Sequence, residues 1–412
     1  MASLLVRAAW VCPVAAPPLG DGWVLVADGR IAAVGCGHDA PTADRVETLG
    51  DVALLPGLVN AHTHLELSWL SGLVPPAADF LTWVGVLMRR RTRFESADDA
   101  VAMAALRGAL DEACATGTVA IGDVSNALVS PPVLRERDVP AVVFHEVFGF
   151  RDADGRTAAA AAAARAAAAS GGSVRVVPAP HAPFSVSAEL FAALRDETRR
   201  LPKPITTVHA GESPEELQLL TTGAGPWRER LQALGAWRDD WRPPGCGPGD
   251  YLCDLGVLGP GALAVHAVQF TDAELARLAA ADVTVVTCPR SNVWVGVGPP
   301  PVARFVASGV RVALGTDSLA SAPDLNLFAE LATLHDIAPE VPARRLLAMA
   351  TRGGAEALQL GDRLGALTPG RDARLVAVTL PAGTADPEAA LVGGITADRI
   401  RRVPTTAAMT VS

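Results

Sequence analysis

Eight apolar, β-branched runs alternate with segments of helical composition between about residue 56 and residue 359. Such alternation is typical of repeated βα units around a parallel sheet. Each run ends near a polar residue, and these residues are His64, Asp123, Glu146, His181, His209, His266, Cys288 and Asp317. Eight strands close a barrel, and barrel enzymes build their sites where the strands end. The sequence therefore predicts an α/β fold of the (β/α)8 TIM barrel type.

The two ends of the chain follow a different pattern. Residues 3–53 alternate apolar and polar positions between turn signals such as Gly20-Asp21-Gly22, which predicts short strands in an antiparallel sheet. Strand-like sequence returns in residues 374–379, after the turn signal Pro369-Gly370. We expect this tail to rejoin the N-terminal sheet, so that both ends build one small domain.

Composition excludes several classes of protein. The formal charge is −9, and no basic run is dense enough to follow a phosphate backbone, so we expect no nucleic acid polymer as partner. The densest run, Arg89–Arg91, is interpreted as the polar face of a helix. No leader-like segment and no apolar run of about 18 residues is found, so we expect no membrane association. The six cysteines form no CxxC pair, which favours free thiols and a cytoplasmic location.

The most specific motif is Asn60-Ala-His62-Thr-His64, at the end of the first predicted barrel strand. Side chains alternate faces along a strand, so the two imidazoles point the same way. His209 ends the fifth predicted strand and Asp317 the eighth. Three imidazoles and a carboxylate suit zinc or a similar divalent ion, with one position left for water. A structural histidine could explain any one of these residues, but four matching strand ends favour a metal site.

Two further side chains would face the same cavity. Glu212 follows His209 by three residues, and His266 ends the sixth predicted strand. Glu212 is placed to shuttle a proton to a substrate, whereas Asp317 and His266 are placed to accept the proton of a metal-activated water. The alternative for Glu212 is a surface residue that begins the long connection over residues 213–261.

Other features limit the alternatives. The only lysine, Lys203, starts the fifth strand at the opposite rim, so a two-metal site bridged by a modified lysine is not available. His64-Leu-Glu66 matches the HxE of another zinc deaminase architecture, but the PCxxC that must accompany it is missing. His181 is a candidate substrate contact, with a structural role as the alternative. The Trp-rich connection 213–261 is a candidate lid, with surface packing as the alternative.

Together these motifs resemble the amidohydrolase superfamily, in its mononuclear branch that deaminates N-heterocycles. The resemblance extends from Leu55–His64 through His209–Glu212 and His266 to Gly315–Leu319. It implies a composite β-sandwich domain of residues 1–55 and 360–412 beside a barrel of residues 56–359. It also implies that the metal ligands are His62, His64, His209 and Asp317. Glu212 would be the proton shuttle and His266 the partner of the attacking water.

Finer motifs, such as Phe80-Leu-Thr-Trp83 and Cys288–Asn292, are similar to those of aminodeoxyfutalosine deaminases. These enzymes are relatives of adenosine and S-adenosylhomocysteine deaminases and serve menaquinone biosynthesis. By this resemblance Trp83, His181 and Arg290 would contact the substrate.

The leading hypothesis is therefore hydrolytic deamination of an aminated purine nucleoside-like compound, with aminodeoxyfutalosine as the first choice. An alternative keeps the site but cleaves another C–N or C–halogen bond, as in a cyclic amidine hydrolase, an amidase or a chlorohydrolase. A third hypothesis is a non-catalytic metal-binding protein. We expect one divalent ion, zinc in the first instance, although the ligand set also tolerates iron or manganese. The partner is a small-molecule substrate, and a homodimer is compatible with the sequence.

Overall fold

The computed structural model describes residues 3–91, 96 and 98–405. Its contacts divide the chain into two units. Unit 1 comprises Met1–Ala61, Asp111–Ala120 and Asn326–Ser412, and unit 2 comprises His62–Leu110 and Ile121–Leu325. The domain boundaries expected from the sequence, at residues 55 and 360, stay a prediction.

Unit 1 contains a mixed seven-stranded sheet of order β15-β14-β5-β1-β2-β3, in which β4 also pairs with β1. The strands are β1 (Ser3–Val11), β2 (Leu19–Ala27), β3 (Arg30–Cys36), β4 (Arg45–Thr48), β5 (Val52–Pro56), β14 (Leu375–Thr379) and β15 (Ile400–Val403). The tail does rejoin the N-terminal strands, because β14 pairs antiparallel with β5. The sheet is not purely antiparallel as expected, since β1 pairs in parallel with β4 and β5. Buried side chains such as Val6, Val24 and Leu54 form its core.

Unit 1 also contains helices, which come from its C-terminal segment Asn326–Ser412. They are α12 (Leu327–Ile337), α13 (Ala343–Ala348), α14 (Gly354–Ala357) and α15 (Pro387–Val392), with a π-helical turn at Met349–Gly353 and a 3-10 turn at Ala397–Arg399. Asn326 caps α12, because its side-chain oxygen accepts a hydrogen bond from the backbone N–H of Phe328 at 3.0 Å.

All eight runs predicted as strands of the barrel are strands in the structure. They are β6 (Leu58–Thr63), β7 (Thr118–Ser125), β8 (Ala141–Val147), β9 (Val174–Pro180), β10 (Thr206–Ala210), β11 (Ala262–His266), β12 (Thr284–Thr287) and β13 (Arg311–Leu314). They form two four-stranded sheets, β6-β7-β8-β9 and β10-β11-β12-β13. The β7–β8–β9 pairs and the three pairs of the second sheet are parallel.

Backbone hydrogen bonds join the two sheets at both of their edges. The N–H of His209 donates to the carbonyl of His181 at 2.9 Å, which links β10 to the end of β9. The N–H groups of Thr316 and Asp317 both donate to the carbonyl of His62 at 3.1 Å, just after β13. These bonds bring the carboxyl ends of β6, β10 and β13 together.

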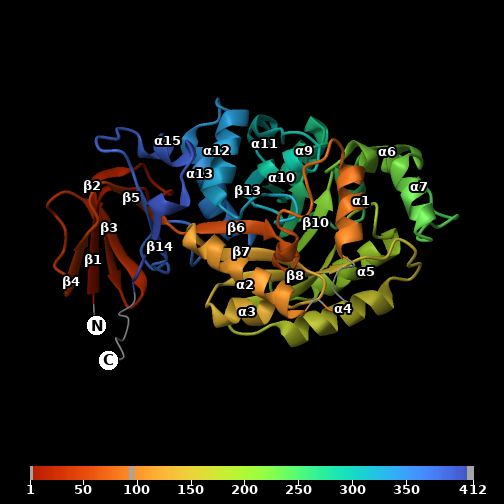
Figure 1. Cartoon of the computed structure of the whole chain (residues 1–412), viewed down its shortest axis with the longest axis horizontal. Helices are drawn as coiled ribbons and strands as arrows, with labels where there is room; N and C mark the ends of the chain where they lie inside the picture. The colour runs from red at the N-terminus through yellow and green to blue at the C-terminus, as the bar shows by residue number, and fades with distance from the viewer. Residues whose placement is uncertain (1–2, 92–95, 97, 406–412) are drawn as a thin grey trace. The chain divides into compact units, whose positions relative to one another are not determined.

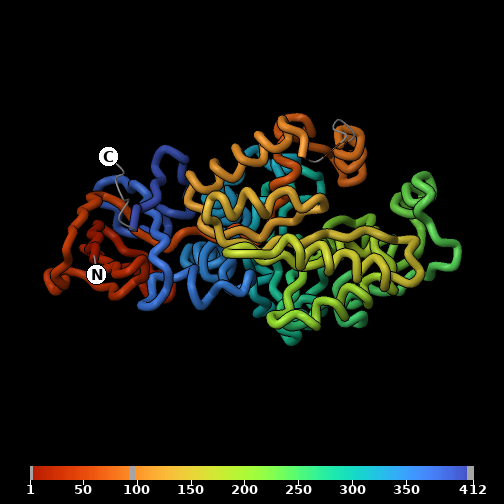
Figure 2. Tube along the Cα trace, turned by 90° about the horizontal axis from the view of Figure 1, so that it is seen from below, coloured from red at the N-terminus to blue at the C-terminus, as the bar shows by residue number. Residues whose placement is uncertain are grey.

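Along the chain, the helices of unit 2 alternate with its strands (Figure 1). They are α1 (Phe80–Arg91), α2 (Ala100–Ala115, which continues into unit 1), α3 (Ser130–Glu136), α4 (Arg156–Ala169), α5 (Ala188–Arg199), α6 (Pro214–Thr222), α7 (Pro226–Ala233), α8 (Pro248–Asp254), α9 (Asp272–Ala280), α10 (Pro289–Trp294) and α11 (Val302–Ser308), with a 3-10 turn at Leu65–Leu70. The alanine-rich segment forms α4, which packs beside α5 and over β9. The connection 213–261 is not a bare loop, because it contains α6, α7 and α8, and α7 lies at the periphery of unit 2 in both views (Figures 1 and 2).

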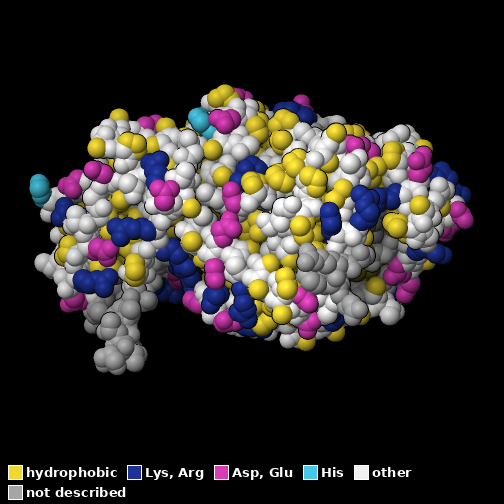
Figure 3. Space-filling model, in the orientation of Figure 1, with side chains coloured by type: hydrophobic (Ala, Val, Ile, Leu, Met, Phe, Trp, Pro, Cys, Tyr) yellow, Lys and Arg dark blue, Asp and Glu magenta, His cyan; other side chains and the backbone are white. Residues whose placement is uncertain are grey.

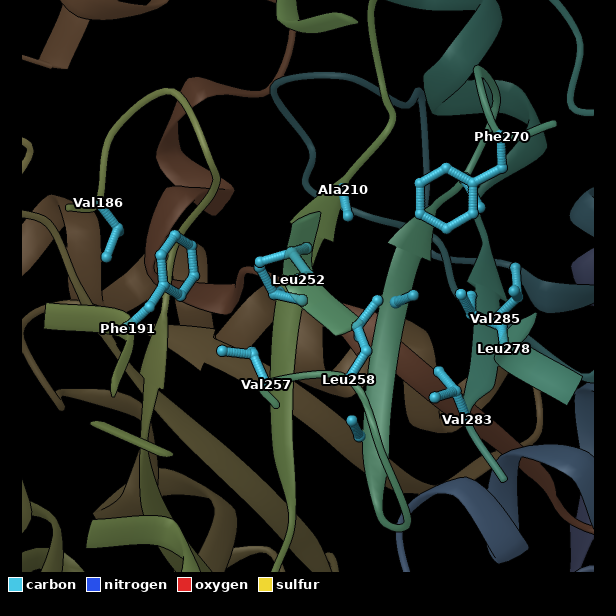
Figure 4. Packing of buried hydrophobic residues seen from close by; sticks show 14 of the residues in the cluster. Val186, Phe191, Ala210, Leu252, Val257, Leu258, Phe270, Leu278, Val283 and Val285 are labelled. Atoms are coloured by element: carbon cyan, nitrogen blue, oxygen red, sulfur yellow. The ribbon is translucent and has the colours of Figure 1, made fainter. Parts of the chain in front are cut away.

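A large apolar cluster fixes the second sheet beneath its helices (Figure 4). Phe191 from α5, Leu252 from α8 and Phe270 before α9 are all fully buried in it. Burial of one such side chain contributes about 1.5–3 kcal/mol relative to exposure. This packing holds the ends of β10 and β11, which carry His209 and His266.

No helix within the described part of the chain is long and apolar enough to cross a membrane. The six cysteines are free thiols, as the sequence predicts.

Candidate metal centre

Four predicted metal ligands meet at the carboxyl ends of three strands. His62 and His64 come from the end of β6, His209 from β10, and Asp317 follows β13 by three residues. One ring nitrogen from each of the three histidines lies within 4.8 Å of the others. Oδ1 of Asp317 lies 3.7 Å from Nε2 of His62 and 3.5 Å from Nε2 of His64. The structure thus brings three imidazole nitrogens close to one another and places the Asp317 carboxylate beside two of them.

Two serines fix the orientation of the Asp317 carboxylate. The hydroxyls of Ser291 and Ser321 donate to Oδ2 of Asp317 at 2.6 and 2.9 Å, which leaves Oδ1 for the imidazoles. The backbone of Asp317 has a φ of 58°, a left-handed conformation that non-glycine residues adopt rarely. Local strain of this kind concentrates at functional sites. The serines therefore position the carboxylate, and neither was identified from the sequence.

The protonation states suit a cation. Burial, and then the neighbouring His62, lower the pKa of His209 to about 3. The pKa of His64 is also well below its ordinary value, chiefly through burial. Burial alone would raise the pKa of Asp317, but the adjacent His62 and His64 hold it well below its ordinary value. Neutral imidazoles and an ionised carboxylate are the donors that zinc takes, so the residues present fit a divalent ion.

His209 makes two polar contacts through its Nδ1. Its Nδ1 lies 3.2 Å from the carbonyl oxygen of His181 and 3.5 Å from Oε1 of Glu146. A proton on Nδ1 would be held by these acceptors, which leaves Nε2 as the ligand atom. Glu146 is buried, and the side-chain amide of Asn126 donates to its Oε2 at 3.0 Å.

Glu212 and His266 form a second buried pair beside the ligands. Oε1 of Glu212 lies 3.4 Å from Nε2 of His266. Burial, followed by the charge of Asp317, raises the pKa of Glu212 well above its ordinary value, so the carboxyl group can carry a proton at neutral pH. On the other side of the ring, Nδ1 of His266 lies 3.0 Å from Nδ2 of Asn292. Its backbone is left-handed as well, with a φ of 75°.

A cavity of about 220 Å³ opens onto these residues. Its polar wall comprises His64, Asn126, Glu146, His181, Ser185, His209, Glu212, His266, Asp317 and Ser318, and its remaining wall comprises Leu67, Phe80, Trp83, Val84, Leu87, Met88, Arg91, Phe148, Phe184, Trp227, Arg230, Leu231 and Leu234. The interpretation of Arg89–Arg91 as a solvated helix face is wrong for Arg91, which lines this cavity.

The predicted substrate contacts divide into two groups. Trp83 and His181 line the cavity; the indole N–H of Trp83 donates to the carbonyl of Ala320 at 3.2 Å, and Nδ1 of His181 lies 2.6 Å from Oγ of Ser185. Arg290 does not line it. Its guanidinium pairs with Asp324 at 2.7 Å, because the first turn of α10 directs this side chain towards that carboxylate. The structure therefore gives no support to Arg290 as a substrate contact.

Sequence reasoning missed Asn126, and it placed Glu146 at a strand end without giving it a role. No pairing pattern along the chain connects Glu146 to Asn126 or to His209. Glu66 belongs to the same network, since its carboxylate accepts hydrogen bonds from the hydroxyl of Ser125 and from the N–H of Asn126, at 2.7 and 2.9 Å. This carboxylate fixes the loop that carries Asn126.

Comparison with known proteins places this geometry in a family. The amidohydrolase family model matches residues 53–403. The aminodeoxyfutalosine deaminase of Deinococcus radiodurans is 32% identical over 318 residues, which cover 75% of this chain and 74% of that relative. The 5-methylthioadenosine/S-adenosylhomocysteine deaminase of Nitratidesulfovibrio vulgaris is 31% identical over 387 residues, covering 89% and 81%.

Solved structures agree with this assignment. The zinc-bound adenosine deaminase of Xanthomonas campestris is 27% identical, with a TM-score of 0.81 and coverage of 97% of this chain and 90% of that one. The aminofutalosine deaminase of Helicobacter pylori, with methylthio-coformycin bound, shares the fold at a TM-score of 0.83 and 22% identity, covering 97% and 100%. The chain therefore belongs to the amidohydrolase family, and it is a hydrolase of the type that acts on C–N bonds.

Proposed function

We propose that this protein is a metal-dependent hydrolytic deaminase of an aminated purine nucleoside-like compound. The observation that carries the proposal is the buried Glu212–His266 pair, at 3.4 Å. It lies beside a cluster of three imidazoles, two of which contact the Asp317 carboxylate. A structural metal site needs no such acid and base beside it. The names of the relatives, which are deaminases of adenosine-like nucleosides, support the same reaction.

We propose that His62, His64, His209 and Asp317 hold one divalent ion, with zinc as the first choice and iron or manganese as alternatives. When bound, such an ion supplies Lewis acidity, which lowers the pKa of water from 15.7 to about 7. The zinc in the adenosine deaminase from Xanthomonas campestris supports this choice.

The residues around the ligands supply the proton transfers. Glu212, protonated at neutral pH, donates to the ring nitrogen next to the carbon that bears the amino group. Asp317 and His266 take up the proton of the attacking water. That proton then passes to the amino group, so that the carbon–nitrogen bond breaks and ammonia leaves. The second proton of the water returns to Glu212 as the new carbon–oxygen bond becomes a carbonyl. Trp83 and His181 contact the substrate within the cavity.

The proposal also concerns how the sheets are arranged. We infer that the two four-stranded sheets form one (β/α)8 barrel, and that the sheet built from both chain ends is part of a β-sandwich domain. The hydrogen bonds from His209 to His181 and from Thr316 and Asp317 to His62 support the barrel, because they connect the sheets at both edges. Eight parallel strands in a closed ring would place the metal ligands at one rim.

Aminodeoxyfutalosine is the first-choice substrate, with a role in menaquinone biosynthesis. The relative from Deinococcus radiodurans supports this choice. The same assay also tests the two other hypotheses, which are cleavage of another C–N or C–halogen bond and a non-catalytic metal-binding protein. Protein whose metal content has been measured is assayed for ammonia release from aminodeoxyfutalosine, adenosine and S-adenosylhomocysteine. Release from at least one of them is expected. If none of the three compounds releases ammonia, and other substrates release halide or a carboxylate, the site catalyses a different hydrolysis.

A further inference from the structure

A second buried glutamate follows Glu212 in the chain. Glu216 belongs to the first turn of α6 and is fully buried. Its Oε1 accepts a hydrogen bond from the backbone N–H of Gly211, and its Oε2 accepts one from the N–H of Glu212, both at 3.1 Å. One carboxylate thus holds two successive peptide groups of the segment that carries Glu212.

Burial of this carboxylate is unfavourable unless hydrogen bonds compensate it. Asp and Glu side chains are scattered over the face of the molecule seen in Figure 3, where water solvates them. Among the described residues, the hydrogen bonds to the carboxylate of Glu216 come from Gly211 and Glu212 alone. The cap of α6 does not need this group, because the hydroxyl of Ser213 accepts a hydrogen bond from the N–H of Glu216 at 3.3 Å.

The carbonyl side of the same segment is bonded to the chain that follows β11. The carbonyl of Ala210 accepts a hydrogen bond from the N–H of Ala267 at 3.0 Å. The carbonyl of Gly211 accepts one from the N–H of Gln269 at 2.8 Å. Gly211 has a φ of 62°, and a Cβ at this position would lie 2.4 Å from the ring of Phe270. Figure 4 shows Ala210 at the end of β10 and Phe270 just after β11.

These contacts determine where the Glu212 carboxyl group lies. Its Oε1 is 3.4 Å from Nε2 of His266, which ends β11. Without the carboxylate of Glu216, the N–H side of the segment would lose its acceptors, and Glu212 could move relative to His266. Proton transfer depends on such distances, and a displacement of about 1 Å can lower a rate about 100-fold.

We propose that Glu216 is a positioning residue, whose carboxylate holds the backbone of Gly211 and Glu212 and so directs the Glu212 carboxyl group towards the substrate. This inference rests on the proposed deaminase function, because that function assigns the proton transfer to Glu212. Glu216 is not among the residues that line the cavity, so it acts through Glu212 and does not touch the substrate.

The variant Glu216→Gln tests this role. Glutamine keeps the size of the side chain, but its amide accepts only one of the two N–H groups and presents a donor to the other. We expect kcat for ammonia release to fall roughly 10- to 100-fold, with KM within about twofold of wild type and an unchanged metal content. The substrate is the fastest of aminodeoxyfutalosine, adenosine and S-adenosylhomocysteine. Assays at pH 8 keep Glu216 ionised, because burial raises its pKa from 4.5 to about 7.

Glu274→Gln is the matched control. Glu274 is also buried, and its carboxylate accepts hydrogen bonds from the N–H groups of Gly249 and Thr271, at 2.9 and 2.8 Å. These groups lie at the starts of α8 and α9 and not in the segment of Glu212. The control should lose stability, as Glu216→Gln does, and keep the wild-type kcat. An equal fall of kcat in both variants would indicate general loosening of the fold and would overturn the proposal.

Combination with Glu212→Gln shows whether Glu216 acts through Glu212. The double variant Glu212→Gln/Glu216→Gln should have the kcat of Glu212→Gln within about twofold, because no proton shuttle is left to position. A further fall by the same factor as in the single variant would mean that Glu216 acts independently of Glu212, against the proposal.

Hydrogen exchange tests the contact in the wild-type protein. The amide hydrogens of Gly211 and Glu212 should exchange with solvent at least about 100 times more slowly than those of an unfolded peptide, because both N–H groups donate to a buried carboxylate. Exchange at the rate of an unfolded peptide would remove the contact and the proposal with it.

The outcomes separate this inference from the proposed function. If metallated protein turns over no aminopurine, or if Glu212→Gln keeps the wild-type kcat, the proposed function is wrong and this inference falls with it. If Glu212→Gln is impaired while Glu216→Gln keeps the wild-type kcat or loses its metal, the deaminase function stands and the positioning role is overturned.

Discussion

Oε1 of Glu212 lies 3.4 Å from Nε2 of His266, and both side chains are buried beside the metal ligands. Burial raises the pKa of Glu212 well above its ordinary value and lowers that of His266 well below it. A carboxyl group that keeps its proton and an imidazole that stays neutral therefore face each other. This combination of a proton donor and a proton acceptor is what addition of water to an aromatic ring requires.

The first prediction concerns Glu212→Gln. The amide keeps the shape of the side chain but cannot transfer a proton, so kcat should fall at least 100-fold while the bound metal stays at the wild-type level. Steady-state kinetics and metal analysis of the same sample measure both. Glu215→Gln, at the start of α6, is the control and should retain activity. Full activity in Glu212→Gln would remove Glu212 from the reaction and favour a metal-binding protein without catalysis.

A second prediction concerns the serines that hold Asp317. Ser291→Ala/Ser321→Ala removes both hydrogen bonds to Oδ2, so the carboxylate can rotate away from the imidazoles. Loss of such supporting contacts typically weakens metal binding by 10–100-fold. Competition with a chelator measures the affinity. Ser308→Ala, which changes a partly buried serine at the end of α11, serves as control. Unchanged affinity in the double variant would show that Asp317 is positioned by its backbone alone.

Metal should also stabilise the fold. Zinc that binds only the native state raises the free energy of unfolding by about 2.7 kcal/mol when its concentration is 100 times the Kd. Chelator-treated protein should therefore lose activity and melt at a lower temperature, and zinc should restore both. His62→Ala/His64→Ala should show no zinc-dependent change in Tm. A Tm of this variant that still rises with zinc would place the ion somewhere else.

The pH dependence of stability should reveal Asp123. Burial raises the pKa of this carboxyl group from 3.8 to about 7, against the hydrogen bonds that it accepts from Ser130 and from the N–H of Leu65. Because the native state binds the proton more tightly than the unfolded chain, the stabilisation is complete below pH 4 and is lost as the pH rises through 7.

Asp123→Asn mimics the protonated acid, so the free energy of unfolding of this variant minus that of wild type should increase from pH 4 to pH 8. The increase should be a few kcal/mol, at about 1.4 kcal/mol per pKa unit. Denaturant melts at several pH values measure it, and effects of the buried histidines cancel in the difference. A difference independent of pH would mean that Asp123 is ionised throughout. The surface substitution Asp239→Asn controls for charge removal.

The aromatic side chains that line the cavity, among them Trp227 and Phe184, lead to a further prediction. Trp227 is 5% exposed and stacks on Phe184 with a centroid distance of 3.9 Å. Trp227→Ala should destabilise the protein by about 3 kcal/mol and should raise KM more than it lowers kcat, because the wall touches the substrate and not the reacting atoms. Trp227→Phe should recover much of both. Wild-type KM in the alanine variant would mean that the wall is only part of the core.

Some features of the structure depend on contacts across space, which the sequence pattern does not give. The alternating pattern of residues 3–53 predicts strands, but it cannot give their direction, and β1 pairs in parallel with β4 and β5. Arg290 follows a strand end closely in sequence, yet the turn of α10 directs it to Asp324. Arg91 reads as one of three solvated arginines, although the end of α1 places it in the cavity wall.

The sequence alone determined the eight strands and the residues near their ends. Period-two alternation sends His62 and His64 to one face, His209 lies in a later strand, and Asp317 follows another by three residues. It could not determine which side chains complete the centre. Ser291 and Ser321 reach Asp317, and Asn126 reaches Glu146, only because loops from different strands pack against one another. Backbone periodicity depends only on residues that are neighbours in the chain. These contacts depend instead on where segments far apart in the chain lie after folding.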